Sequence, residues 1–142
     1  KGVLAVFINE DNKLLLCQRS DNKTWQFPQG GIDEGESIEA CLYREMSEEI
    51  GVSQFSIIKR SSVFISYDFP KDLKTNIAKN YQGQTQVWFL CRLHKKSDLQ
   101  FDKRTCDEFC DFSWSTKKHI LAGIVAWKKS SYSQGFKSLE LI

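Results

Sequence analysis

The chain has 142 residues, a formal net charge of +2 and 41% hydrophobic residues, which fits one globular α/β or α+β domain and excludes a disordered chain. No apolar run approaches the ~20 residues that a membrane-spanning helix needs, and no signal peptide is recognisable. Five cysteines without a C-x-x-C pair favour a reducing cytosol. Because the chain opens on Lys1, further residues are expected before it.

The first third of the chain is rich in β-forming residues. Runs at 3–8 and 13–19 are separated by four polar residues, which predicts a hairpin. A short strand is expected at 25–27, ending at Pro28, which cannot donate to a strand ladder. Residues 29–35 contain three glycines and are expected to form a loop.

A helix is predicted between Ser37, a favourable N-cap, and Gly51, a favourable residue after the last turn. Within it, apolar residues recur every four positions, so one stripe is expected to face a core. The stripe consists of Ile38, Leu42, Met46 and Ile50, with Cys41 beside it.

The rest of the chain predicts further strands and one long C-terminal helix. Strands are expected at 55–58, 63–67, 85–93 and 109–114, a surface loop at 70–83, and the helix at 120–139. The expected layering is a mixed sheet between two helices.

The chemistry is concentrated in the helix at 37–50. Glu45, Glu48 and Glu49 are neighbours at helical spacing and form one carboxylate patch, where like charges repel. A divalent cation would relieve that repulsion, and oxygen-only ligands favour Mg²⁺ or Mn²⁺. Arg44 is placed to pair with Glu48. Spacing alone is equally compatible with an ordinary charged surface helix.

Residues 30–52 read G-G-I-D-E-G-E-S-I-E-A-C-L-Y-R-E-M-S-E-E-I-G-V. This string resembles the Nudix box, G-x5-E-x7-R-E-U-x-E-E-x-G-U, where U is a bulky aliphatic residue. Every specified position matches: Gly30, Glu36, Arg44, Glu45, Met46, Glu48, Glu49, Gly51 and Val52. The resemblance implies an α/β/α sandwich around a mixed sheet, one domain over residues 1–142, and a Mg²⁺- or Mn²⁺-dependent hydrolase that cleaves a diphosphate linked to another moiety.

A narrower resemblance begins at W-Q-F-P-Q-G-G-I, residues 25–32. It is similar to a group that contains bacterial RNA pyrophosphohydrolases and asymmetric dinucleoside-polyphosphate hydrolases. Segments at 67–70, 83–89, 107–109 and 125–129 resemble the bacterial branch, which favours 5′-triphosphorylated RNA as substrate. The alternative is diadenosine tetraphosphate, cut to ATP and AMP. A catalytically inactive nucleotide-binding module is a third reading, but it would carry a damaged box, and this box is intact.

The resemblance also implies roles for individual residues. Glu45, Glu48, Glu49, Glu108 and Gly30 would hold the metal ions, with Glu48 as the expected general base. Arg44 would orient the helix carboxylates, and Glu36 would brace the loop.

Substrate contacts are expected from Arg19, Gln29, Gly30, Gly31, Trp127 and Lys128. Trp127 either stacks on a base or packs in the core, and the sequence leaves both open. Gln84 and Gln86 could line the pocket. Neither a DNA nor a membrane partner is expected, and no oligomeric state is predicted.

Overall fold

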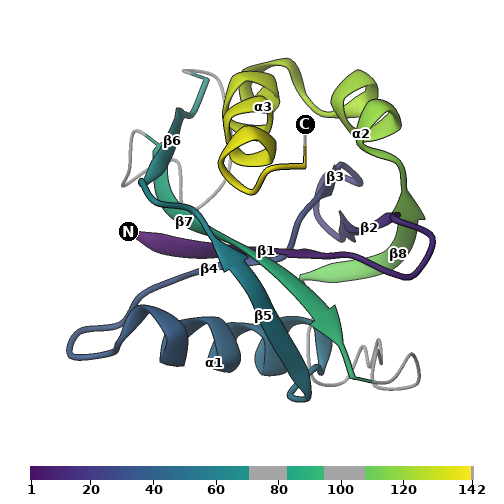
Figure 1. Ribbon diagram of the computed structural model, residues 1–142. Coiled ribbons are helices and arrows are strands. Elements are labelled where there is room, and N and C mark those ends of the chain that lie inside the picture. The colour runs from purple at the N-terminus through teal and green to yellow at the C-terminus, as the bar shows by residue number, and fades with distance from the viewer. Residues whose placement is uncertain (71–82, 95–107, 142) are drawn as a thin grey trace.

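The computed structural model describes residues 1–70, 83–94 and 108–141, which form two sheets and three α-helices (Figure 1). The larger sheet has the order β4-β1-β7-β5, and β6 also pairs with β7. Its strands are β4 (Gln29–Gly31), β1 (Gly2–Phe7), β7 (Gly83–Leu93), β5 (Phe55–Arg60) and β6 (Ile65–Asp68). The smaller sheet has the order β3-β2-β8, with β3 (Trp25–Gln26), β2 (Leu14–Arg19) and β8 (Phe109–Ser115).

The larger sheet is mixed, because β1 runs parallel to β7 while the other pairs are antiparallel. Helix α1 (Ile38–Ile50) lies on one side of it, and α3 (Lys129–Ser138) lies on the other, with α2 (Lys117–Gly123) beside α3 (Figure 1). The predicted α/β sandwich is therefore confirmed. Adjacent residues of β7 show the layering, since Trp88 and Phe89 are both buried but belong to two different core clusters.

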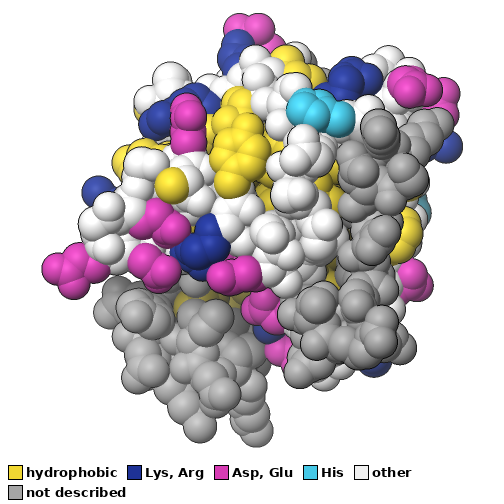
Figure 2. Space-filling model, turned by 90° about the horizontal axis from the view of Figure 1, so that it is seen from below, with side chains coloured by type: hydrophobic (Ala, Val, Ile, Leu, Met, Phe, Trp, Pro, Cys, Tyr) yellow, Lys and Arg dark blue, Asp and Glu magenta, His cyan; other side chains and the backbone are white. Residues whose placement is uncertain are grey.

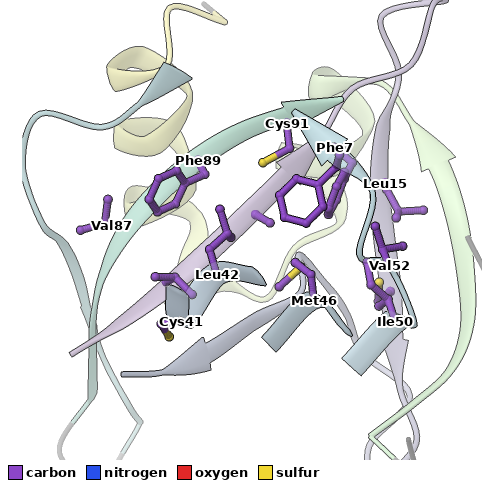
Figure 3. Close-up of a cluster of buried hydrophobic side chains, with 14 of the residues drawn as sticks. Phe7, Leu15, Cys41, Leu42, Met46, Ile50, Val52, Val87, Phe89 and Cys91 are labelled. Atoms are coloured by element: carbon purple, nitrogen blue, oxygen red, sulfur yellow. The ribbon is translucent and has the colours of Figure 1, made fainter. Parts of the chain in front are cut away.

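The core below the sheet is built around α1. Side chains from the helix meet side chains from β1 and β7, as Figure 3 shows for Leu42, Met46, Phe7, Phe89 and Cys91. Each of these is fully shielded from solvent. Burial of the predicted apolar stripe fixes the rotation of the helix about its axis, so its acidic residues lie at the edge of this core.

Both ends of α1 have the predicted caps. The Ser37 hydroxyl accepts a hydrogen bond of 3.1 Å from the Ala40 amide. Gly51 has φ of 66°, a left-handed conformation that glycine adopts at low cost, and its amide donates to the Met46 carbonyl. The helix that carries the box residues is thus delimited as the sequence predicted.

The predicted hairpin between 3–8 and 13–19 is wrong. β1 and β2 belong to different sheets and share only one bridge, Ile8 to Leu14. Instead, β1 pairs with β7 along its whole length and with β4 at Gly2–Leu4, while β2 pairs with β3 and β8. The loop predicted at 29–35 is also partly strand, because residues 29–31 form β4.

The single C-terminal helix predicted at 120–139 is also wrong. The chain forms α2, an extended pair at Ile124 and Val125, a 3₁₀ turn at Ala126–Lys128 and then α3. Ile124 is buried in the core between the sheet and α3, which we call the upper core, and its ψ is 150°. Because this β-branched residue packs there in an extended conformation, α2 ends before it. The break turns Trp127 and Lys128 toward the site described below. Of the loop predicted at 70–83, residues 71–82 lie outside the described part, and Gly83 belongs to β7.

Candidate active site

A cavity of about 240 Å³ opens where α1, β4 and the start of β8 meet. We call it the carboxylate cavity because Glu45, Glu49 and Glu108 contribute to its wall. The other lining residues are Arg19, Gln26, Gln29, Gly30, Gly31, Gln84 and Gln86. The cavity therefore collects most of the residues that the sequence assigned to metal and phosphate binding.

Glu49 is the most deeply buried of these carboxylates, at 7% exposure. One of its oxygens accepts a hydrogen bond of 3.2 Å from the Gln29 amide. Burial, followed by the nearby carboxylates of Glu108 and Glu45, raises the pKa of Glu49 well above its usual range. Burial likewise raises the pKa of Glu45, although Arg44 opposes the shift. Arg44 therefore compensates part of the charge on Glu45, whereas the charged form of Glu49 stays disfavoured in the protein alone.

Gly30 lets the loop backbone approach the helix carboxylates. A methyl group in place of its α-hydrogen would overlap the Glu45 side chain, whereas a methyl group at Gly31 would meet no atom within 4 Å. The two consecutive glycines therefore differ in function, because only position 30 requires the absence of a side chain.

Arg44 donates hydrogen bonds to several other residues of the Nudix-box segment. Its guanidinium donates to Glu36 at 2.7 Å, to Glu45 at 2.8 Å, to Glu48 at 3.2 Å and to the Gly31 carbonyl at 2.9 Å. Glu36 in turn accepts from the Asp33 amide at 3.1 Å. Arg44 holds the pKa of Glu36 down, at about 2. Arg44 thus contacts two helix carboxylates and Glu36 contacts the loop; that Arg44 orients the carboxylates and Glu36 braces the loop stays a prediction.

Glu48 is placed differently from Glu45 and Glu49. Its side chain is 60% exposed and pairs with Arg44, and it is not part of the cavity wall. Figure 2 shows the face on which α1 lies, where acidic side chains gather around a basic one. The predicted carboxylate patch is therefore divided, with two members in the cavity and one on the solvent side.

A second cavity, of about 210 Å³, adjoins the first, and Arg19, Gln26, Gln29 and Gln84 contribute to the walls of both. We call it the aromatic cavity because Trp25, Tyr67, Phe69 and Trp127 line it. Asn22, Thr24, Val125 and Lys128 complete the wall. Trp127 is half-buried and packs against Tyr67 and Phe69, with ring centroids 5.4 and 5.9 Å apart. Its ring therefore combines packing with a place in the wall of a cavity.

Lys128 lies at 6% exposure between the aromatic rings and Gln26. Its ammonium nitrogen donates to the Gln26 side-chain carbonyl at 2.9 Å and lies 5.1 Å from the Trp127 ring centroid and 5.4 Å from that of Tyr67. Burial, followed by repulsion from Arg19, lowers the pKa of Lys128 to about 7. This cation is therefore poised to gain from an incoming anion.

Sequence reasoning missed two residues that organise the site, Gln26 and Tyr67. Gln26 is buried and bonds Lys128, while the Tyr67 hydroxyl accepts from the Gln29 side chain at 3.3 Å. Gln86, considered only as a lining residue, also donates to the Gln29 side chain at 2.7 Å. The sequence did contain a signal for Gln26, because it lies between Trp25 and Phe27 in the string W-Q-F-P-Q. Burial of a glutamine costs free energy unless its side chain has a hydrogen-bond partner, so a partner was to be expected.

The donor set fits a hard divalent cation. Every candidate ligand is an oxygen, from a carboxylate or, at Gly30, from the backbone carbonyl. Burial, followed by repulsion from Glu108 and Glu45, raises the pKa of Glu49, and a bound cation would offset both. Within the described residues, no three acidic, histidine or cysteine side chains already converge on one point as a metal cage. Arg44 accounts for part of this, because it draws Glu48 and one oxygen of Glu45 toward itself.

The family described as NUDIX domain matches residues 1–134 of this chain. The chain belongs to the Nudix family. An RNA pyrophosphohydrolase from Gluconobacter oxydans is 37% identical over 135 residues, covering 92% of this chain and 79% of the relative.

Solved structures agree on the fold. The E. coli dihydroneopterin triphosphate pyrophosphohydrolase aligns with a TM-score of 0.74 and 22% identity, covering 94% of this chain and 92% of that one. An Ap4A hydrolase from C. elegans aligns with a TM-score of 0.69 and 18% identity over the full length of both chains. This protein is therefore a Nudix hydrolase, and Nudix hydrolases generally use a divalent metal ion.

Proposed function

We propose that this Nudix hydrolase removes pyrophosphate from the 5′ end of triphosphorylated RNA, using Mg²⁺ or, in its place, Mn²⁺. The observation that carries the proposal is the pair of adjoining cavities, one lined by carboxylates and one by aromatic rings around a buried lysine. A nucleoside 5′-polyphosphate has matching parts, since its phosphates need cations and its base needs a stacking surface. The RNA pyrophosphohydrolases at 36–38% identity support RNA as the substrate class.

In this proposal the two cavities bind different parts of the substrate. The phosphates lie along the junction that both cavities share, where Arg19 and Lys128 supply positive charge and the backbone of Gly30 and Gly31 allows close approach. A base rests against Trp127. Partly buried Gln29 links the two parts, because its backbone amide donates to Glu49 and its side chain donates to Tyr67.

Glu45, Glu48, Glu49 and Glu108, together with Gly30, are the proposed ligands of the metal ions. When bound, the metal offsets charge on the phosphate oxygens and lowers the pKa of a coordinated water. Glu48 is the proposed general base. Its side chain is exposed to water and is held by Arg44, so it can accept the proton of the water that attacks phosphorus.

The alternative substrate is diadenosine tetraphosphate, which presents the same 5′-polyphosphate to the same groups. A comparison of kcat/KM for triphosphorylated RNA and diadenosine tetraphosphate with Mg²⁺ tests the proposal, with Glu48→Gln as the blank. We expect the RNA to be preferred by at least about tenfold and the products to be pyrophosphate and monophosphorylated RNA. A preference for the dinucleotide would make the protein a signalling-nucleotide hydrolase instead.

We further propose that residues 1–142 act as one catalytic unit in the cytoplasm. Cys41, Cys91 and Cys110 form no disulfide within the described residues, in keeping with a reducing compartment. No helix in the described ranges is long and apolar enough to cross a membrane.

A further inference from the structure

A third cavity, of about 220 Å³, lies beside the aromatic cavity, between the smaller sheet and α2. We call it the α2 groove. Its wall is formed by Leu16, Trp25, Ser113, Ser115, His119, Ile120, Gly123 and Ile124. None of these residues belongs to the Nudix box, and apart from Trp25, which also lines the aromatic cavity, none has a task in the function proposed above.

The α2 groove adjoins the aromatic cavity. Trp25 contributes to the walls of both, and Ile124 of the groove is followed directly by Val125 of the aromatic cavity. A chain that leaves the aromatic cavity beside Trp25 therefore reaches the groove within a short distance. The carboxylate cavity adjoins the aromatic cavity through Arg19 and the glutamines, so the three cavities form a series.

The lining of the groove suits a nucleobase. Trp25 and His119 offer flat aromatic groups, Leu16, Ile120 and Ile124 offer an apolar floor, and the hydroxyls of Ser113 and Ser115 offer hydrogen bonds. Its wall, as the described residues form it, has no aspartate or glutamate to repel a polyanion. The carboxylate cavity differs in this respect, because it requires a cation before it can accept phosphate.

We propose that the α2 groove binds a base of the RNA downstream of the nucleotide in the aromatic cavity. The inference rests on the proposed function and extends it from the 5′ end to the body of the RNA. A substrate that ends after one nucleotide leaves the groove empty. Diadenosine tetraphosphate likewise leaves it empty, because its second adenosine is joined through the phosphates. The groove is thus a determinant of specificity for RNA chains.

Gly123 provides a direct test. Gly123 lines the groove, and a β-carbon built at this position meets no atom within 4 Å, so a larger side chain has room there. Gly123→Phe would fill the groove, and Gly123→Ala is the matched control that keeps it open. Both variants leave every proposed metal ligand and phosphate contact unchanged.

The assay compares kcat/KM for a nucleoside triphosphate, a triphosphorylated ten-nucleotide RNA and diadenosine tetraphosphate. We expect the wild type and Gly123→Ala to favour the RNA over the nucleoside triphosphate by about tenfold, the ratio that ~1.4 kcal/mol of base stacking gives. Gly123→Phe should remove that preference and leave the rates for the two short substrates unchanged. His119→Ala should reduce the same preference without filling the cavity, which keeps the test valid if the phenylalanine variant fails to fold.

Two results would contradict base binding in the α2 groove but leave the proposed function intact. One is a preference for the RNA that survives Gly123→Phe and His119→Ala. The other is an equal loss on all three substrates, which would mean that the phenylalanine distorts the aromatic cavity. A wild-type protein that cleaves diadenosine tetraphosphate but not the RNA would overturn the proposed function, and the inference with it.

Discussion

The carboxylate cavity and the aromatic cavity share four wall residues but bury charges of opposite sign. In the first, burial and neighbouring carboxylates raise the pKa of Glu49. In the second, burial and Arg19 lower the pKa of Lys128 to about 7. Both shifts favour the neutral form, so each cavity is destabilised by its own charge in the free protein.

The two cavities differ in how that charge can be compensated. The carboxylates require a cation, and the lysine requires an anion. A metal-bound polyphosphate supplies both, with the metal against Glu45 and Glu49 and the phosphates against Lys128 and Arg19. Buried charge that the protein compensates poorly therefore indicates the charge of the ligand. If the protein already compensated it fully, ligand binding would gain less free energy.

Glu49→Gln should have the largest effect, because it removes the charge from the most buried carboxylate and keeps its size. We expect kcat to fall by about 1000-fold, since metal-ion stabilisation of the transition state is worth several kcal/mol at ~1.36 kcal/mol per tenfold. The melting temperature of the metal-free protein should not fall, because repulsion with Glu108 and Glu45 is relieved. Steady-state kinetics and calorimetry measure the two effects. Activity within tenfold of the wild type would remove Glu49 from the proposed metal site.

Gly30→Ala should have the next largest effect. The new methyl group overlaps the Glu45 side chain, so the Glu45 carboxylate must shift or the helix and the loop must separate slightly. Misplacement by a fraction of an ångström to 1 Å lowers catalysis by up to about 100-fold, and we expect a fall in kcat of about 10- to 100-fold. Gly31→Ala is the matched control, because position 31 has open space, and it should stay within about threefold of wild type. Equal effects of the two substitutions would contradict the special role of position 30.

The carboxylate cavity was largely predictable from sequence because its key residues lie on one helix. Helical spacing brings Glu45 and Glu49 together, and the caps at Ser37 and Gly51 fix where the helix begins and ends. What spacing could not show is that Arg44 holds Glu48 on the solvent side. That arrangement depends on Glu36 and on the Gly31 carbonyl, which the loop and β4 bring to the guanidinium.

The aromatic cavity was less predictable because its residues come from distant parts of the chain. Trp127 and Lys128 reach it only because Ile124 and Val125 are extended and interrupt the predicted helix. Local propensity favoured one continuous helix, and burial of Ile124 in the upper core outweighed it. The partner of Lys128 is Gln26, on β3, and no local pattern indicates a hydrogen bond across that separation.

Lys128→Met tests the second cavity through stability. Lys128 has a pKa of about 7 in the folded protein, against an ordinary value of 10.5. Below pH 7 the ammonium is charged in both states, so the whole cost of burying its charge lowers the free energy of unfolding. As pH rises from about 7 to 10.5 the unfolded chain binds the extra proton, and the wild type gains stability by up to ~1.4 kcal/mol per pH unit. Lys128→Met lacks this dependence, so the difference between the two proteins should shrink with pH.

Urea unfolding of both proteins at several pH values between 7 and 9.5, without metal or nucleotide, measures that difference. Lys129→Met is the matched control, because Lys129 is the exposed neighbour in the chain. A high concentration of inorganic pyrophosphate should flatten the wild-type curve, since a bound anion keeps Lys128 charged without cost. If Lys128→Met and Lys129→Met give the same pH dependence, burial does not lower the pKa of Lys128. The proposed contrast between the two cavities would then be wrong for the aromatic cavity.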